Sequence, residues 1–329
     1  MKKIIALLLI LVLSLSLIAC GNGKNGDDPV IAFVPKVIGQ AWWDYVETGV
    51  KEWAKETGYE VIYKGPSEVD AAAQVAIMTD LVNQGVDILC FSPNDPAACE
   101  EICRQAREKG IIVISTEAAT MKNVDYDVEA FNDEGLGGFL MDELAKMMGE
   151  EGEYITMVGS MTMESHNNWA NAAVARAKAK YPKMTLVADE RVSSDSDAER
   201  AYQLTKELIQ TYPNLKGILG TSSFDAPGAA RAIKELGLTG KVFAISVAMP
   251  SETRSLLKEG VLQSVGLWDP ALSAKAMLNL GVAMFKGEKP ASGMDLKVEG
   301  YKNVTITGTL VVGQGSLAIT KDNVDNFNF

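Results

Sequence analysis

The residues of this sequence that are best suited to recognising a small molecule begin in one loop. The loop follows the apolar run 30–34, which has the pattern of a strand buried on both faces. It carries Lys36, Gln40, Trp42 and Trp43. Charged and amide side chains make directed hydrogen bonds to hydroxyl groups, and indole rings cover C–H faces, so this loop has what a neutral polyol or sugar requires. We expect the loop to form one wall of a ligand cleft.

The other aromatic candidates also lie at predicted loops or strand ends. Of the five tryptophans, Trp53 has the helical spacing of a core residue, whereas Trp169 and Trp268 join the pair in the loop as possible ligand contacts. His166 is the only histidine. In its polar loop it could hydrogen-bond a ligand, but one histidine makes neither a catalytic nor a metal-binding constellation.

The elements that must position these residues alternate between strand and helix. After the first strand and its helix, we expect strands at 59–63, 86–91 and 111–115 with helices at 71–84 and 96–109. A polar segment, 117–125, interrupts the rhythm. The second array has strands at 126–131, 154–159, 185–190, 217–221 and 242–247, and helices at 133–148, 167–180, 197–212 and 227–236. Helices between apolar strands are typical of parallel sheets, so the chain is predicted to be α/β with two similar halves.

The remaining residues are less regular. We expect a helix at 252–258, a strand at 262–267, a long helix at 271–285, and late strands near 304–312 and 317–320. This tail is too short for a third domain. It is expected to complete the other two halves and to cross between them more than once.

The first residues have the pattern of an export signal. Met-Lys-Lys is followed by an uncharged apolar stretch, 4–19, which predicts a signal peptide at 1–19. Residues 17–21, Leu-Ile-Ala-Cys-Gly, resemble a bacterial lipobox, which implies lipidation of Cys20 and a tether through residue 29; an ordinary signal peptide with a chance cysteine is the alternative. A diacylglycerol anchor would hold a soluble domain on a membrane surface. We expect the rest of the chain to be exported.

Composition and motifs argue against several classes of function. The formal net charge is −12, which argues against nucleic acid or an anionic membrane surface as a partner. The nucleotide-binding, serine-hydrolase and zinc-protease motifs are absent from the sequence, so we expect neither an enzyme nor a cofactor. Cys90, Cys99 and Cys103 would remain in the exported chain, and their odd number leaves at least one unpaired. We expect no function for them.

Several segments together resemble the type I periplasmic sugar-binding proteins, the extracytoplasmic receptors of ABC importers. Three of the features are the lipobox, the two arrays of strands and helices, and the short connector that follows residues 111–117, Ile-Ile-Val-Ile-Ser-Thr-Glu. Two further matching stretches are 81–87, Leu-Val-Asn-Gln-Gly-Val-Asp, and 227–232, Pro-Gly-Ala-Ala-Arg-Ala. The chain looks most like the branch that holds autoinducer-2-binding and rhamnose-binding proteins. That branch is suggested by residues 33–39, 63–67, 168–169, 266–270 and 321–327.

The resemblance implies a fold of two doubly wound, Rossmann-like lobes joined by a three-strand hinge. Lobe one would comprise 30–117 plus 249–288. Lobe two would comprise 122–246 plus 290–329. The hinge strands would lie near 116–120, 247–250 and 286–292. Asp269 would stand at the cleft edge and could bind ligand or brace the hinge.

The resemblance also implies particular ligand contacts. A lysine at the position of Lys36 binds ligand hydroxyls in autoinducer-2 receptors, and Pro227 and Ala229 match contact positions that act through backbone and shape. Asn94 and Asp95 fall where many sugar receptors place a polar contact. The alternative for this pair is a cap for the helix that opens at residue 96.

Three positions depart from the autoinducer-2 receptors. Those proteins carry acids where this chain has Ala119 and Ser165, and glutamine where it has His166. Acids near predicted strand or loop ends could compensate, namely Glu117, Glu164 and Asp225. The ligand is therefore left open among autoinducer-2, a deoxysugar, and another pentose or hexose.

The predicted function is that of a monomeric, lipid-anchored receptor on the extracytoplasmic face of the cell membrane. It would close on one small polyhydroxylated ligand and deliver it to ABC permease subunits. A sensor that presents its ligand to a membrane signalling protein is the alternative. A DNA-binding regulator of the same fold would need a DNA-binding domain where this sequence has a lipobox.

Overall fold

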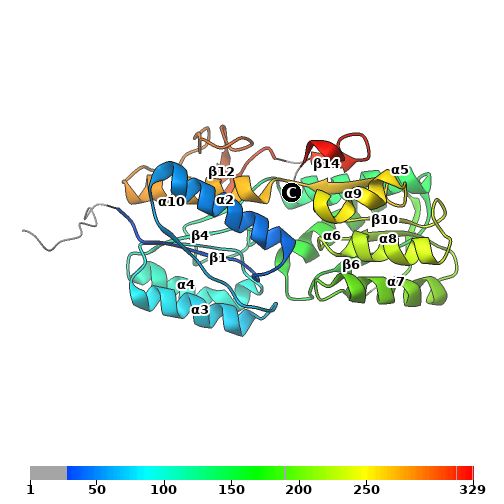
Figure 1. Cartoon of the computed structure of the whole chain (residues 1–329), viewed down its shortest axis with the longest axis horizontal. Coiled ribbons are helices and arrows are strands. Elements are labelled where there is room, and N and C mark those ends of the chain that lie inside the picture. The colour runs from blue at the N-terminus through cyan, green and yellow to red at the C-terminus, as the bar shows by residue number, and fades with distance from the viewer. Residues whose placement is uncertain (1–27, 189, 316, 328) are drawn as a thin grey trace, which may run out of the picture.

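The structure is a computed structural model that describes residues 28–188, 190–315, 317–327 and 329. The predicted signal peptide, Cys20 and most of the tether lie outside these residues. Two lobes of sheet and helix lie side by side along the long axis (Figure 1). Within the described ranges, no helix has both the length and the apolar character needed to cross a membrane.

The first lobe is built on a seven-stranded sheet with the order β12-β13-β5-β4-β3-β1-β2. All neighbours are parallel except the hairpin of β12 and β13. The strands are β1 (Ile31–Val34), β2 (Val61–Tyr63), β3 (Ile88–Phe91), β4 (Ile112–Ser115), β5 (Tyr126–Glu129), β12 (Thr305–Thr307) and β13 (Leu310–Val312).

Helices cover both faces of this sheet (Figure 1). The helices are α2 (Ala41–Thr57), α3 (Ala71–Gln84), α4 (Pro96–Glu108) and α10 (Pro270–Phe285). Successive residues of β1 point to opposite faces of the sheet, and both faces are apolar. Ile31 and Phe33 pack in the core that includes α2 and α10. Ala32 and Val34 pack in the core beneath α3 and α4. A continuous apolar run is what a strand with two buried faces requires.

Short polar residues and glycines set the helix ends. The side chains of Asp70 and Asp95 accept hydrogen bonds from first-turn amides of α3 and α4, which would otherwise have no partner. Gly58 and Gly85 follow α2 and α3 with φ of 84° and 78°, a left-handed conformation that glycine adopts without steric cost.

The second lobe has a smaller parallel sheet with the order β10-β9-β6-β7, and β8 also pairs with β6. Within it, α5 packs against α6, and α7 packs against α8. The elements are β6 (Glu151–Val158), β7 (Lys183–Leu186), β8 (Val192–Ser193), β9 (Leu215–Gly220), β10 (Phe243–Ile245), α5 (Asp133–Met148), α6 (Glu164–Lys180), α7 (Ala198–Thr211), α8 (Asp225–Glu235) and α9 (Pro250–Lys258). A third, two-stranded antiparallel sheet joins β11 (Ser264–Leu267) to β14 (Leu317–Thr320), and the short helix η1 (Val324–Asn326) packs against α9.

The predicted assignment of segments to lobes is wrong in three places. Strand β5 and the β12–β13 hairpin belong to the first sheet, whereas the prediction places 122–131 and 304–312 in lobe two. Helix α9 packs against α8 and η1, so 250–258 lies with lobe two instead of lobe one. Strand pairing decides membership here, because β5 finds its partners in β4 and in β13, far along the chain.

The hinge segments are displaced accordingly. The chain crosses between the lobes after β5, between β11 and α10, and after β13. The segments of the first and third crossings lie side by side, because the amides of Gly313 and Gly315 donate hydrogen bonds to the carbonyl oxygens of Glu129 and Ala130. The predicted hinges near 116–120, 247–250 and 286–292 are therefore not where the crossings lie, although a fold with three crossings was expected.

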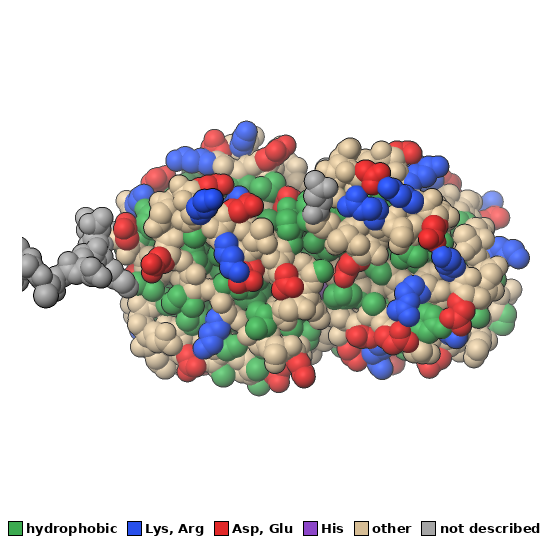
Figure 2. All heavy atoms as spheres, viewed as in Figure 1, with side chains coloured by type: hydrophobic (Ala, Val, Ile, Leu, Met, Phe, Trp, Pro, Cys, Tyr) green, Lys and Arg blue, Asp and Glu red, His purple; other side chains and the backbone are tan. Residues whose placement is uncertain are grey.

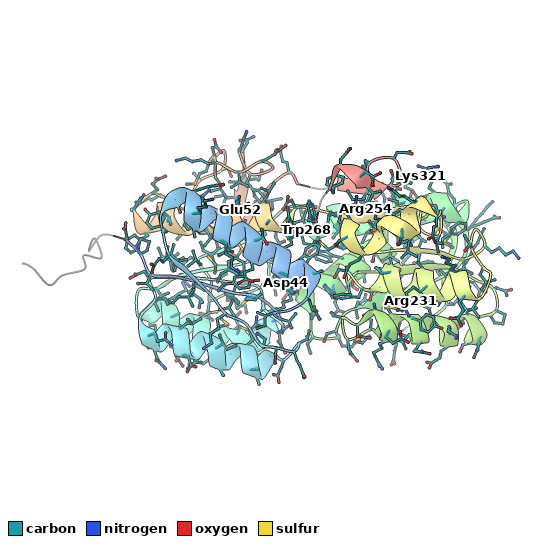
Figure 3. The ribbon with its side chains drawn as sticks, viewed as in Figure 1. Asp44, Glu52, Arg231, Arg254, Trp268 and Lys321 are labelled. Carbon is teal, nitrogen blue, oxygen red and sulfur yellow. The ribbon has the colours of Figure 1, made fainter. Side chains whose placement is uncertain are left out.

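The surface view shows the two lobes of the molecule. Acidic and basic side chains are scattered over both lobes on the face shown, and the outline narrows between them (Figure 2). Trp268 lies at this junction (Figure 3).

Candidate functional site

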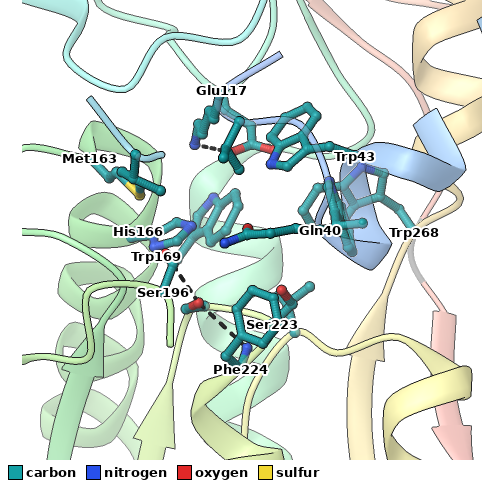
Figure 4. A pocket seen from close by; sticks show the side chains of 16 residues that line it. Gln40, Trp43, Glu117, Met163, His166, Trp169, Ser196, Ser223, Phe224 and Trp268 are labelled. Atoms are coloured by element: carbon teal, nitrogen blue, oxygen red, sulfur yellow. Dashed lines mark hydrogen bonds and ion pairs between the residues drawn. The ribbon is translucent and has the colours of Figure 1, made fainter. Parts of the chain in front are cut away.

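A cavity lies between the lobes, at the carboxyl ends of the parallel strands. The space in it that the centre of a water molecule can occupy is about 40 Å³. Lys36 and Glu117 reach it from beyond β1 and β4, and Ser222 and Val247 from beyond β9 and β10. Loops at this edge of a parallel sheet are where ligands of such folds bind. Figure 4 shows its lining residues from close by.

The lobe-one wall is the loop between β1 and α2 together with the first turn of α2, which carries Trp42 and Trp43 that were expected in the loop. Lys36, Gln40, Trp42 and Trp43 all line the cavity. The turn before α2 depends on Gly39, whose φ is 77°. Its amide donates to Asp44 Oδ1 at 3.1 Å, which fixes the loop against the first turn of the helix.

A buried ion pair forms one end of the cavity. Lys36 Nζ lies 2.6 Å from Glu117 Oε2, and the two side chains are only 5% and 7% exposed. Ser165 Oγ on α6 donates to the same oxygen at 3.1 Å, and Lys36 Nζ lies 3.4 Å from Ser165 Oγ. Because Ser165 belongs to the other lobe, this cluster joins the two lobes.

Glu117 is held in an unusual backbone conformation. Its φ is 58°, which a residue with a side chain rarely adopts outside functional or strained sites. Its amide donates to Glu129 Oε1 at 2.5 Å. Burial and the neighbouring Asp127 raise the pKa of Glu129 well above its usual value.

His166 supplies a neutral ring to the lobe-two wall. The amide of Gly159 donates to His166 Nδ1 at 3.1 Å, so the ring proton lies on Nε2. Burial and the charge of Lys36 hold the pKa of His166 well below its usual value. The ring is therefore a hydrogen-bond donor for ligand oxygens without being a cation. Gly159 permits this approach, since a Cβ there would lie 2.8 Å from the imidazole.

Serine hydroxyls complete the polar lining. Ser196, Ser222 and Ser223 face the cavity from two loops. Asp225 shapes the second loop by accepting from the amides of Thr221 and Ser222, both at 2.9 Å. Burial raises the pKa of Asp225 to about 6.

Aromatic rings form the apolar side of the site and span both lobes. Trp268 makes edge-to-face contacts with Trp42, Trp169 and Phe131, with ring centroids 4.8, 5.6 and 5.0 Å apart. This geometry is the one that aromatic quadrupoles favour. The site therefore offers a rigid apolar surface opposite hydroxyl, amide and imidazole groups, which suits a small uncharged ligand with both C–H and O–H faces.

Comparison with known protein families agrees with this architecture. A family model described as a periplasmic binding protein domain matches residues 31–289. The chain belongs to the periplasmic binding protein family. Membership identifies it as a binding protein instead of an enzyme, and it confirms the family and fold that the sequence resemblance implied.

Curated relatives cover most of this periplasmic binding protein. The D-allose-binding periplasmic protein of Escherichia coli (strain K12) is 26% identical over 78% of this chain and 85% of its own length. The ribose import binding protein RbsB of Bacillus subtilis (strain 168) is 23% identical over 88% and 95%.

Solved structures share the two-lobed fold. LsrB from Clostridium saccharobutylicum, in complex with AI-2, has a TM-score of 0.83 at 23% identity and covers 91% of this chain and 100% of its own. An ABC transporter solute binding protein from Clostridium phytofermentas, with bound L-rhamnose, has a TM-score of 0.83 at 20% identity, covering 91% and 98%. At these identities the likeness shows the fold.

Half of the predicted site residues of this binding protein meet in the cavity. They share a position on its lining and come from both lobes: Lys36, Trp42, Trp43, Glu117, His166, Trp169 and Trp268.

The other predicted site residues lie outside the lining. Asp95 and Asp269 accept hydrogen bonds from first-turn amides of α4 and α10, and Asp269 also accepts from Tyr45. Asn94 is buried and donates to the carbonyl oxygen of Lys36 at 2.7 Å, so it supports the loop from behind. Ser165 acts in the ion-pair cluster described above.

The three predicted residues around α8 are buried behind the cavity. Asp225 supports the loop, and Pro227 and Ala229 lie in the helix among its buried residues. Several residues that do line the cavity were not predicted, namely Val37, Val69, Met163, Ser196, Ser222, Ser223, Phe224 and Val247. Ser222, Ser223 and Phe224 directly follow a predicted strand, and that position was the signal that could have identified them.

Metal binding has no support in the described residues. Within them, no group of three histidine, cysteine or acidic side chains could hold a metal ion. Cys90, Cys99 and Cys103 are buried, and burial raises the pKa of the Cys99 thiol to about 12, which makes it unreactive.

Proposed function

We propose that this protein is an extracytoplasmic receptor that closes on one small, uncharged, polyhydroxylated ligand and delivers it to an ABC permease. The observation that carries the proposal is the cavity between the lobes. Its two charged groups neutralise each other, and it combines tryptophan rings with serine, amide and imidazole groups. A charged ligand would lack a counter-charge there, whereas a sugar or autoinducer-2 would match both the rings and the hydrogen-bonding groups.

Closure follows from contacts that ligand makes with both lobes at once. Lobe one would comprise the β1–β5 array with α10 and the β12–β13 hairpin, and lobe two the rest. A ligand that touches both walls binds the shut state better, so it shifts the population toward closure. The cavity-lining residues from each lobe are the proposed ligand contacts.

A thermal-shift screen would test the ligand class. Protein lacking residues 1–21 would be melted with rhamnose, ribose, xylose, galactose, glucose and autoinducer-2. A ligand that binds only the folded state stabilises it by about 2.7 kcal/mol at a hundredfold excess over Kd, so a binder must raise Tm. Absence of a shift with every compound would contradict the proposed ligand class while leaving the fold intact.

The proposed location needs its own experiment. Lipidation of Cys20 would place the protein on the outer face of the cell membrane. Cells fed labelled palmitate should yield labelled protein in the membrane fraction, and Cys20→Ala should abolish both the label and the membrane association. Equal labelling of the variant would refute the anchor.

A further inference from the structure

One polar side chain extends across the ligand cavity itself. Gln40 precedes α2 at its N-cap position, but its side chain makes no capping hydrogen bond. Asp44 instead fixes this turn through the amide of Gly39. The Gln40 side chain is thereby released from the helix, and Figure 4 shows it lying across the middle of the cavity, pointing from lobe one toward His166 and Trp169 of lobe two.

The Gln40 carboxamide differs from the charged groups beside it, Lys36 and Glu117, which bond to each other. His166 uses Nδ1 to accept from Gly159. No hydrogen bond joins Gln40 to another of the residues drawn around the cavity (Figure 4). It therefore offers a ligand both an amide donor and a carbonyl acceptor, on a side chain that itself fills part of the cavity.

The size of this side chain matters for ligand choice. Beyond its Cβ, a glutamine places four heavy atoms into the cavity, whereas the hydroxymethyl group that separates a hexopyranose from the matching pentopyranose has two. A close-packed site cannot hold both groups in the same space.

We propose that Gln40 sets the size of the accepted ligand, by filling the space that a hexose hydroxymethyl group would need. The site then takes compact ligands of pentose size. This inference rests on the proposed function, because it concerns the same cavity.

Matched sugars allow a direct test. Xylose and glucose, ribose and allose, and L-arabinose and galactose each differ by one hydroxymethyl group. Calorimetric Kd values would be compared for wild type, Gln40→Ala, Gln40→Glu and the control Gln203→Ala, which alters an exposed glutamine on α7. For whichever pentose–hexose pair binds, the Kd of wild type should be lower for the pentose than for the hexose by roughly tenfold or more. One misfitting group in a pocket raises Kd by about this factor.

The two Gln40 variants should then show whether the volume of the side chain or its charge sets the preference for the pentose. Gln40→Ala should lose pentose affinity, gain hexose affinity and remove the preference, whereas Gln40→Glu, which keeps the volume, should retain it. The control should match wild type. A preference unchanged in Gln40→Ala, or a wild type that favours the hexose, would overturn the inference while leaving the sugar receptor intact. A wild type that binds no compound of either panel would overturn the proposed function, and this inference with it.

Discussion

At the scale of single residues, the buried Lys36–Glu117 pair dominates the site. Both side chains are almost fully removed from water, and desolvating two charges costs several kcal/mol that only good geometry recovers. The hydrogen bond from Ser165 and the short Nζ–Oε2 distance supply that geometry. Each member of the pair is therefore tolerated only while the other is present.

Replacing Lys36 tests this dependence. Lys36→Met keeps most of the side-chain volume but leaves Glu117 buried without its cation, so we expect a loss of about 3–5 kcal/mol in stability and a fall in ligand affinity of more than tenfold. The double variant Lys36→Met/Glu117→Gln should recover stability but not affinity. Thermal melting and calorimetry measure both, with the exposed Lys64→Met as control. Affinity equal to wild type in the single variant would show that Lys36 does not contact ligand.

Glu252 on α9 should make stability depend on pH. Burial raises its pKa from 4.5 to about 7, and among the described residues none pairs with its buried Oε2. The folded state then binds more protons than the unfolded state between about pH 4.5 and 7, so this contribution to stability is lost as pH rises through that window.

Glu252→Gln should remove this dependence of folding stability on pH. The variant should be more stable than wild type at pH 8, by about 3 kcal/mol at most, and should lose this advantage near pH 4. Urea unfolding across this range measures the difference, and the exposed Glu68→Gln should show none. A constant difference between variant and wild type at all pH values would exclude titration of Glu252 as the cause.

The sequence identified site residues where side-chain type and strand end coincided. Lys36, Trp42 and Trp43 follow a fully apolar strand, so both their chemistry and their position were visible. Asp95 was ambiguous because an aspartate before proline at a helix start is equally a cap, and the structure shows it capping α4. Asp269 was predicted to bind ligand or brace the hinge, and the structure shows it capping α10. The inward direction of Ser196 depends on consecutive left-handed residues, Asp195 and Ser196, with φ of 54° and 51°, which no local pattern predicted.

At the scale of elements, the close packing of α5 against α6 depends on a glycine, Gly137. A Cβ on Gly137 of α5 would lie 2.3 Å from the carbonyl oxygen of Trp169 and 2.6 Å from Ala172 Cβ on α6. Backbone atoms cannot yield as a flexible side chain can. The neighbouring Gly138 faces open space, and a Cβ added there would meet no atom within 4 Å.

These adjacent glycines form a matched pair. Gly137→Ala should push α5 from α6 and lower the free energy of unfolding by about 1–3 kcal/mol. Gly138→Ala should raise it by roughly 0.5–1 kcal/mol, because alanine favours helix over glycine. Thermal and urea unfolding would measure both. Similar effects of the two substitutions would mean that α5 and α6 are not packed as described.

Element types were largely predictable, whereas their partners were not. The predicted helices at 71–84 and 133–148 match α3 and α5 to the residue, because an aspartate or asparagine cap, an apolar period and a terminal glycine agree there. The long late strand near 304–312 proved to be the β12–β13 hairpin, turning at Gly308 with φ of 62°. Its pairing with β5 joins segments far apart in sequence, which local propensity does not encode.

At the scale of the whole molecule, the lobes also touch outside the ligand cavity. Thr120 of lobe one donates from its amide to Glu164 Oε1 at 3.1 Å and from its hydroxyl to Glu164 Oε2, at the start of α6. Phe329 stacks on Tyr45 of α2 with ring centroids 4.2 Å apart, while its carbonyl oxygen accepts from the Ser251 amide on α9. Such contacts exist only when the lobes are together and so add to closure.

Weakening one of them should weaken ligand binding from a distance. Glu164→Gln keeps a single acceptor oxygen for two donors, and a lost hydrogen bond of this kind is worth about 1 kcal/mol. We expect a roughly fivefold higher Kd, expressed mainly as faster ligand dissociation, with Tm of the ligand-free protein unchanged. Surface plasmon resonance measures the rates, and Glu134→Gln, exposed on α5, is the control. A dissociation rate equal to that of wild type would show that this contact does not stabilise closure.

The placement of the tryptophans gives the molecule a built-in optical reporter. Four of its five indoles surround the cavity, so a ligand that displaces water there changes the polarity around most of the intrinsic fluorescence. The fifth, Trp53, is buried between α2 and α10, where its Nε1 donates to Asn279 at 2.7 Å, and it supplies a constant background. Emission from the unlabelled protein should therefore follow ligand entry and lobe closure in real time.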